Sequence, residues 1–192
     1  MVVSYQTEGR ALSTSAQTLE RQVVDFFADR LKVQQREAGV RHDIIDAVTV
    51  LVEEDDFVRL LARVNALQGF VETEEGADLL TAYKRAANIL KKENWTSGPR
   101  NAHIDADDLE TYERALIATL DGSEPAAEKA IADEDFTGAM AVLAFMRAPI
   151  DQFFDHVTVN DPDPQKRERR LNLLMRFRDA VNRVADFSKI EG

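Results

Sequence analysis

The clearest helical pattern in the chain lies near its C-terminal end, where residues 161–184 read DPDPQKRERRLNLLMRFRDAVNRV. Apolar side chains recur there at every third or fourth position, which is the spacing of one buried face of an α-helix. These side chains are Leu171, Leu174, Phe177, Val181 and Val184. Pro162 and Pro164 precede them, and proline is tolerated in the first turn of a helix because the N–H group that it lacks has no partner there. The pattern predicts a long last helix that starts close to Pro164.

The same spacing runs through most of the chain and predicts helices throughout. Thr73 followed by two glutamates is typical of a helix start, since a hydroxyl caps the first turn and acids favour the positive end of the helix dipole. That helix is expected to extend to about Lys92. Gly39 stands where a helix end needs a left-handed residue, and Pro125 suits the first turn of a new helix. Residues 94–106 form the one clear break. Strict alternation of apolar and polar residues is missing, so we expect an all-α bundle of about eight or nine helices.

The composition is that of a globular protein with one domain. The chain has 192 residues, of which 44% are hydrophobic and 31% are charged, and no apolar run approaches the roughly 20 residues of a membrane span. We place the helical domain at residues 16–192, and we expect residues 1–15, which are small and polar without a pattern, to be a flexible N-terminal segment. The absence of cysteine excludes disulfides and thiolate catalysis and fits a cytoplasmic protein. The three histidines are too scattered to predict a metal site.

The net charge of −11 is unevenly distributed along the chain. Residues 105–136 hold eleven acids and two bases, net −9, whereas residues 165–192 hold eight bases and four acids, net +4. Electrostatic attraction is screened within about 8–10 Å at physiological salt, so a local basic face matters more to an RNA partner than the total charge. The alternative is that the basic helix is a solvated face without any partner.

No catalytic pattern is present in the sequence. Glycine-rich loops that hold phosphates are absent, and no serine, histidine and aspartate stand in a recognisable nucleophile arrangement. We therefore predict no catalytic residue, no metal and no cofactor for this chain.

Residues 83–88, which read YKRAAN, carry the best binding chemistry. Lys84 and Asn88 are four residues apart and share one helix face, with Arg85 beside them. A cation for phosphate, an amide for a base edge and an aromatic ring for stacking are what single-stranded RNA recognition uses. Tyr83 has the ring for such stacking, but the favoured interpretation is that it belongs to the core. Arg167 and Arg170 are expected to contact phosphates from the last helix. In the tail, residues 186–190 combine two apolar side chains with a cation, which favours an anchor with a basic residue on it.

Three stretches, taken in order, resemble the β subunit of bacterial glycyl-tRNA synthetases, the class built from separate α and β chains. They are FFADRLKV at residues 26–33, GADLLTAYKRAANIL at residues 76–90, and FFDHVTVN at residues 153–160 with the DPDP that follows it. The resemblance spans roughly residues 20–192 and is weak between 94 and 130. It implies the helical anticodon-binding domain of that family, which is related to the one in arginyl-tRNA synthetases. It also implies that the chain is an excised piece of a longer β subunit, a natural short protein being the alternative.

The resemblance carries expectations about partners and contacts. The parent enzyme is expected to be an α₂β₂ assembly in which the α subunit uses ATP and magnesium to charge the tRNA. This chain would bind the anticodon arm of tRNA(Gly). The residues expected to contact it are Arg30, Arg41, Lys84, Arg85, Asn88, Arg167, Arg170 and Lys189. Arg169 stands where the family pattern has asparagine. The alternative is a helical protein-interaction module without RNA. RNA binding is favoured if Lys84, Arg85, Arg167 and Arg170 fall on one surface.

Overall fold

The computed structural model describes residues 26, 30, 32–50, 57–96 and 109–191, and this part of the chain is helical without a strand. Its elements are α2 (His42–Thr49), α3 (Phe57–Val71), α4 (Glu74–Lys92), α5 (Thr111–Ala132), α6 (Phe136–Ala144), α7 (Arg147–His156), α8 (Pro164–Asn182) and the 3₁₀ turn η2 (Phe187–Lys189). Residues 32–37 are also helical. The all-α class predicted from the sequence is therefore confirmed.

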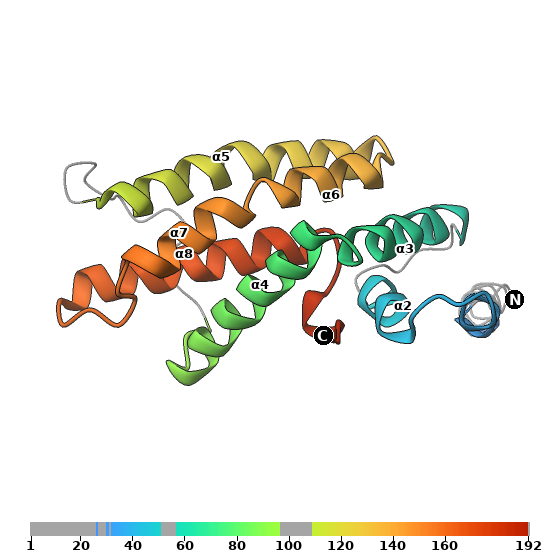
Figure 1. Ribbon diagram of the computed structural model, residues 1–192, viewed down its shortest axis with the longest axis horizontal. Helices are drawn as coiled ribbons and strands as arrows, with labels where there is room; N and C mark the ends of the chain where they lie inside the picture. Colours follow the sequence, from blue (N-terminus) through green and yellow to red (C-terminus); the bar gives the residue numbers. More distant parts are fainter. Residues whose placement is uncertain (1–25, 27–29, 31, 51–56, 97–108, 192) are drawn as a thin grey trace, which may run out of the picture.

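The helices pack as two groups around α8 (Figure 1). α5 and α6 form a hairpin along one side, and α5 also packs against α7 and α8. α4 crosses on the other side of α8 and contacts α7 as well, while α3 and α2 continue the bundle towards the described N-terminal residues. α8 thus has the helix of residues 111–132 on one flank and the helix of residues 74–92 on the other. No helix among these described residues is long and apolar enough to span a membrane.

The structure confirms the predicted helix start or end at three positions. The Thr73 hydroxyl accepts the N–H of Gly76 at 3.1 Å and begins α4, and the Asp163 carboxylate accepts the N–H of Gln165 at 2.8 Å and begins α8 at Pro164. Gly39 has a φ of 89°, the left-handed conformation that glycine adopts without steric cost. These three predictions are confirmed because each rests on a local hydrogen bond or a local backbone preference.

The prediction of a new helix at Pro125 is wrong. α5 continues through Pro125 without interruption for 22 residues, so the described residues hold the seven labelled α-helices, the helical residues 32–37 and one 3₁₀ turn, where the sequence predicted about eight or nine helices. A proline inside a helix removes one backbone hydrogen bond and costs about 3 kcal/mol. Leu116, Leu120 and Ala127 lie on both sides of it and are all buried on one face of α5. Burial of that continuous face offsets the cost of the proline.

The C-terminal segment returns to α2 and is held there. Phe187 and Ile190 are buried in the core, as predicted for an apolar anchor. The N–H of Asp186 donates to the carbonyl of Ala47 at 2.8 Å, and the N–H of Glu191 donates to the carboxylate of Asp43 at 2.7 Å. The tail is therefore part of the folded domain. The expected flexible segment 1–15 lies outside the described residues.

Candidate nucleic-acid interface

Arg170 lies inside the protein, although the sequence placed it among the RNA contacts. Its side chain is 1% exposed. Its guanidinium donates to Glu113 at 3.0 Å, Asp161 at 2.6 Å, Glu110 at 2.5 Å and the carbonyl of Thr158 at 2.7 Å. Burial lowers the pKa of Arg170, but the carboxylates around it outweigh that effect and hold the pKa above its ordinary value. Arg170 joins α5, α8 and the segment between α7 and α8, so it does not belong with the tRNA contacts.

The other arginines of α8 that face α5 are also held by acids. Arg169 meets Glu113 at 3.2 Å, and Arg176 meets Asp121 at 2.6 Å and Glu124 at 2.7 Å. Two turns further along the chain from Arg176, an ion pair joins residues 183 and 128. The described part of the acidic stretch, residues 109–136, is therefore packed against α8, which carries most of the bases of the basic stretch. Much of the positive charge of α8 is therefore neutralised within the fold.

A row of basic residues lies on the solvent side of α4. Taking about 100° per residue, Lys84, Arg85, Asn88, Lys91 and Lys92 fall within an arc of about 120° of this helix. All of them are exposed except Lys84, which is half-buried. We call these five residues the α4 face. The opposite side of α4 is buried against the core, so the helix presents cations and one amide to solvent as an ordered row.

Tyr83 belongs to the core rather than to this face. Its side chain is 2% exposed, and its ring lies 5.7 Å from the ring of Phe187. Burial, the largest cause, raises the pKa of the Tyr83 hydroxyl. The aromatic contribution to the α4 face comes from another helix: the guanidinium of Arg85 lies 4.2 Å from the centre of the Phe154 ring on α7. Phe154 therefore orients Arg85, and exposed guanidinium planes are surfaces on which RNA bases stack.

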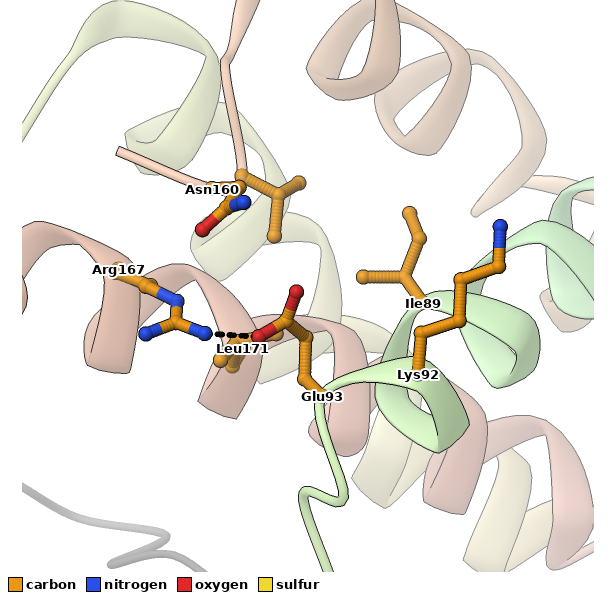
Figure 2. Close-up of a pocket in the computed structure, with 7 residues that line it drawn as sticks. Ile89, Lys92, Glu93, Asn160, Arg167 and Leu171 are labelled. Carbon is orange, nitrogen blue, oxygen red and sulfur yellow. Dashed lines mark hydrogen bonds and ion pairs between the residues drawn. The ribbon is translucent and has the colours of Figure 1, made fainter. Parts of the chain in front are cut away.

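A pocket of about 180 Å³ adjoins the C-terminal end of the α4 face. It is smaller than the roughly 300–1,000 Å³ of typical small-molecule sites. Its lining comes from α4, from the segment between α7 and α8, and from α8: Ile89, Lys92, Glu93, Val159, Asn160, Arg167 and Leu171. Figure 2 shows Arg167 and Glu93 joined by an ion pair at one side of this pocket, with Asn160 opposite them. Arg167 thus meets α4 beside Lys92, next to the α4 face.

The remaining predicted contacts lie elsewhere. Arg41 pairs with Asp43 at 2.5 Å and donates to the carbonyl of Glu191 at 2.6 Å, which places it at the junction of α2 and the tail. Lys189 is exposed on η2 in the same tail, and Arg30 is exposed in the N-terminal helical residues. The structure places Lys84, Arg85 and Asn88 on the α4 face and Arg167 beside Lys92 at its C-terminal end, and it leaves Arg30, Arg41 and Lys189 outside that group. Because Arg170 is buried, Lys84, Arg85, Arg167 and Arg170 do not fall together on one exposed surface.

Sequence reasoning missed four residues of this region: Lys91, Lys92, Glu93 and Asn160. Lys92 could have been found, because it continues the four-residue spacing of Lys84 and Asn88. Nothing local singles out Glu93 or Asn160, which are brought together only by the packing of α4 against α8. Within the described ranges, no group of three or more histidine, aspartate and glutamate side chains is arranged to hold a metal ion.

Comparison with known proteins points to one family. The chain is 53% identical over 183 residues to the glycine–tRNA ligase β subunit of Rhodospirillum centenum, 48% identical over 173 residues to that of Phenylobacterium zucineum, and 47% identical over 175 residues to that of Paracoccus denitrificans. These matches cover 94%, 89% and 87% of this chain, but the chain spans only about a quarter of the length of each relative. The family described as the DALR anticodon binding domain matches residues 79–190, which include the α4 face and Arg167. The chain therefore belongs to the DALR anticodon binding domain family.

Proposed function

We propose that this chain is the anticodon-binding domain of a glycine–tRNA ligase β subunit and contributes recognition of tRNA(Gly) to the ligation of glycine to its tRNA. The observation that carries the proposal is the α4 face, an ordered row of exposed cations and one amide within the region that matches the DALR family. The relatives named glycine–tRNA ligase β subunit support the identity of the tRNA.

The division of labour on the α4 face follows from its chemistry. Lys84, Arg85 and Lys92 suit the phosphates of an anticodon loop, and Arg85 also offers a plane for stacking. Asn88 has both a donor and an acceptor, so it suits a base edge. Cytosines of the glycine anticodon would be unstacked and read there. The ion pairs between α5 and α8 hold the framework rigid, which keeps the ordering cost of binding low.

The wider assembly belongs to the same proposal. The parent enzyme is an α₂β₂ ligase of the cytoplasm, with ATP and magnesium used by the α subunit, and this domain holds tRNA without taking part in the chemistry. Its catalytic contribution is to position the tRNA, and no residue of the chain is assigned to a bond-making step.

Fluorescence anisotropy with labelled tRNA(Gly) and a second, unrelated tRNA tests the proposal. We expect binding of tRNA(Gly) that weakens with salt, with a slope of log K against log salt of roughly −3 if about four phosphates are neutralised. The unrelated tRNA should bind more weakly, because base readout and not only phosphate contact is involved. A chain that binds neither tRNA would instead favour the alternative, a protein-interaction module.

A further inference from the structure

We infer that the pocket between α4 and α8 receives one unstacked cytosine of the bound RNA, and that the Glu93 carboxylate selects it over uracil. This inference rests on the proposed function, because it needs an RNA strand on the α4 face. It goes further in assigning a base, a pocket and a residue that selects the base.

The orientation of Glu93 is the first step. One of its carboxylate oxygens pairs with the Arg167 guanidinium, and Figure 2 shows the other pointing between Asn160 and Ile89, towards the cavity. The Glu93 side chain is 19% exposed, so most of it is removed from solvent. Arg167 therefore acts as a positioning residue: it holds the carboxylate so that one acceptor faces the pocket.

The place of Glu93 in α4 is the second step. It is the C-cap residue, and the next residue, Asn94, has a φ of 50° and ends the helix. The N–H of Trp95 then donates to the carbonyl of Leu90 at 2.9 Å, and the Trp95 indole N–H donates to Asn172 of α8 at 2.9 Å. A helix end of this kind is rigid and tied to α8. The position of the carboxylate is therefore defined before any ligand arrives.

Helix stability alone does not account for an acid here. Negative charge at a helix C-terminus is opposed by the helix dipole, an effect of about 0.3–1 kcal/mol near the surface. The two preceding residues, Lys91 and Lys92, have the sign that the dipole favours. Glu93 breaks that pattern, and Arg167 compensates its charge. A carboxylate that Arg167 holds in place, with one oxygen left facing the pocket, is suited to accept a hydrogen bond from a ligand.

The size and the walls of the pocket fit one base. Ile89, Val159 and Leu171 give apolar surface for a flat ring, while Asn160 adds an amide at the rim. A volume of about 180 Å³ lies below the range of sites for whole small molecules, which suits a single base rather than a larger ligand. Lys92 lines the same pocket and would hold the phosphate that follows the base.

Hydrogen-bond chemistry decides which single-ring base is accepted. Cytosine carries an exocyclic amino group that donates to a carboxylate, whereas uracil carries a carbonyl oxygen at that position. A uracil in the pocket would set this oxygen against the Glu93 carboxylate, with no proton between them. The Asn160 amide has a donor and an acceptor for the remaining base edge. The pocket should therefore favour cytosine.

Titration with RNA hairpins tests the assignment. The probes are a hairpin carrying the glycine anticodon in its loop and versions in which each loop cytosine is replaced singly by uracil. For the unmodified chain, one replacement should weaken binding by roughly 5- to 150-fold. Glu93→Gln should reduce that ratio to about one, because a glutamine amide can donate to the uracil oxygen. Glu75→Gln removes the same charge from an exposed position in the first turn of α4 and should leave the ratio unchanged.

The outcomes separate the two proposals. If the unmodified chain binds the hairpin and Glu93→Gln keeps its preference for cytosine, the pocket assignment is wrong and the proposed function stands. If no hairpin and no tRNA binds, the proposed function fails as well. Should Glu93→Gln lose its fold by circular dichroism, Asn160→Ala tests the same pocket from an exposed position outside the helices, and an unchanged affinity of that variant for the cytosine-containing hairpin overturns the assignment.

Discussion

Arg170 Nε lies 3.0 Å from Glu113 Oε1, and the two side chains are 1% and 0% exposed. Glu113 also accepts the backbone N–H of Glu110 at 2.8 Å, so one carboxylate both secures the start of α5 and binds α8. Taking two charges out of water is costly, and the cost is met only where each retains a full set of partners. Both members of this pair keep their hydrogen-bond partners. The pair is therefore a structural link between α5 and α8, formed by two residues that are 57 positions apart in the sequence.

Replacing Arg170 should therefore damage the fold. Arg170→Met leaves Glu113 buried with part of its hydrogen bonding lost, and removal of one member of a buried pair costs about 3–5 kcal/mol. Urea unfolding followed by circular dichroism measures the loss. Arg178→Met is the control, because Arg178 is half-buried and pairs with the adjacent Asp179, so its loss should cost less than about 1 kcal/mol. Equal stability of the two variants would mean that the buried pair carries no special weight.

The same pair predicts how stability depends on pH. Burial raises the pKa of Glu113, but the hydrogen bonds from Arg169, the Glu110 N–H and Arg170 outweigh it and lower the pKa below the ordinary glutamate value. A carboxyl with a lowered folded-state pKa stabilises the fold at pH values above its unfolded pKa of about 4.3, and this contribution is lost as pH falls through the folded value. Glu113→Gln should be less stable at neutral pH, and its stability should fall less steeply below about pH 4.3. If the stability of both proteins falls equally steeply below about pH 4.3, the lowered pKa of Glu113 does not contribute to the stability of the fold.

Two glycines should respond to alanine in opposite directions. At Gly76 an added Cβ would lie 2.0 Å from the carbonyl oxygen of Phe70, because α3 and α4 meet there with backbone against backbone. Gly76→Ala should lower the free energy of unfolding, with a loss of about 1–3 kcal/mol for the forced shift. At Gly69, inside α3, an added Cβ meets nothing within 4 Å. Gly69→Ala should raise the free energy of unfolding by about 0.5–1 kcal/mol, since glycine is a poor helix former. Thermal unfolding of both variants tests the contrast.

Asn88 and Lys92 should affect RNA binding in different ways. Asn88→Ala removes a group suited to a base edge and should cost about 1–3 kcal/mol of binding to tRNA(Gly), with a change in stability of only a few tenths of a kcal/mol. Lys92→Ala removes a phosphate contact, so it should weaken binding to all RNA and flatten the salt slope by about one unit. Anisotropy titrations at several salt concentrations distinguish the two effects. If Asn88→Ala unfolds the protein and leaves affinity per folded molecule unchanged, the recognition face lies elsewhere.

Local signals in the sequence account for the predictions that are confirmed. Thr73, Pro164 and Gly39 each act within one helical turn, through a cap, a missing N–H or a backbone preference, so the residues themselves are sufficient. Pro125 shows the limit of such signals. Its local preference for a helix start was overridden by the buried face that continues on both sides of it.

The candidate site divides in the same way. The Lys84 and Asn88 spacing on one helix could be read from the sequence, since i and i+4 residues share a face in any α-helix. Arg170 could not be distinguished from its neighbours, because a basic run on a helix contains both exposed and inward-facing positions. The pocket beside Arg167 was not predictable either, since its walls come from three segments that are brought together by packing.

By itself the sequence determined the helical class, several helix ends and the shared face of Lys84 and Asn88 on α4, because apolar periodicity and capping act over a few residues. Tertiary structure alone decided which charges face solvent. The acids of α5 reach the arginines of α8 across more than fifty residues of chain, and once they meet, each charge is held by its opposite and withdrawn from other partners. Which cations remain at the surface is therefore a property of how the helices pack, and on α4 Arg85, Lys91 and Lys92 are exposed.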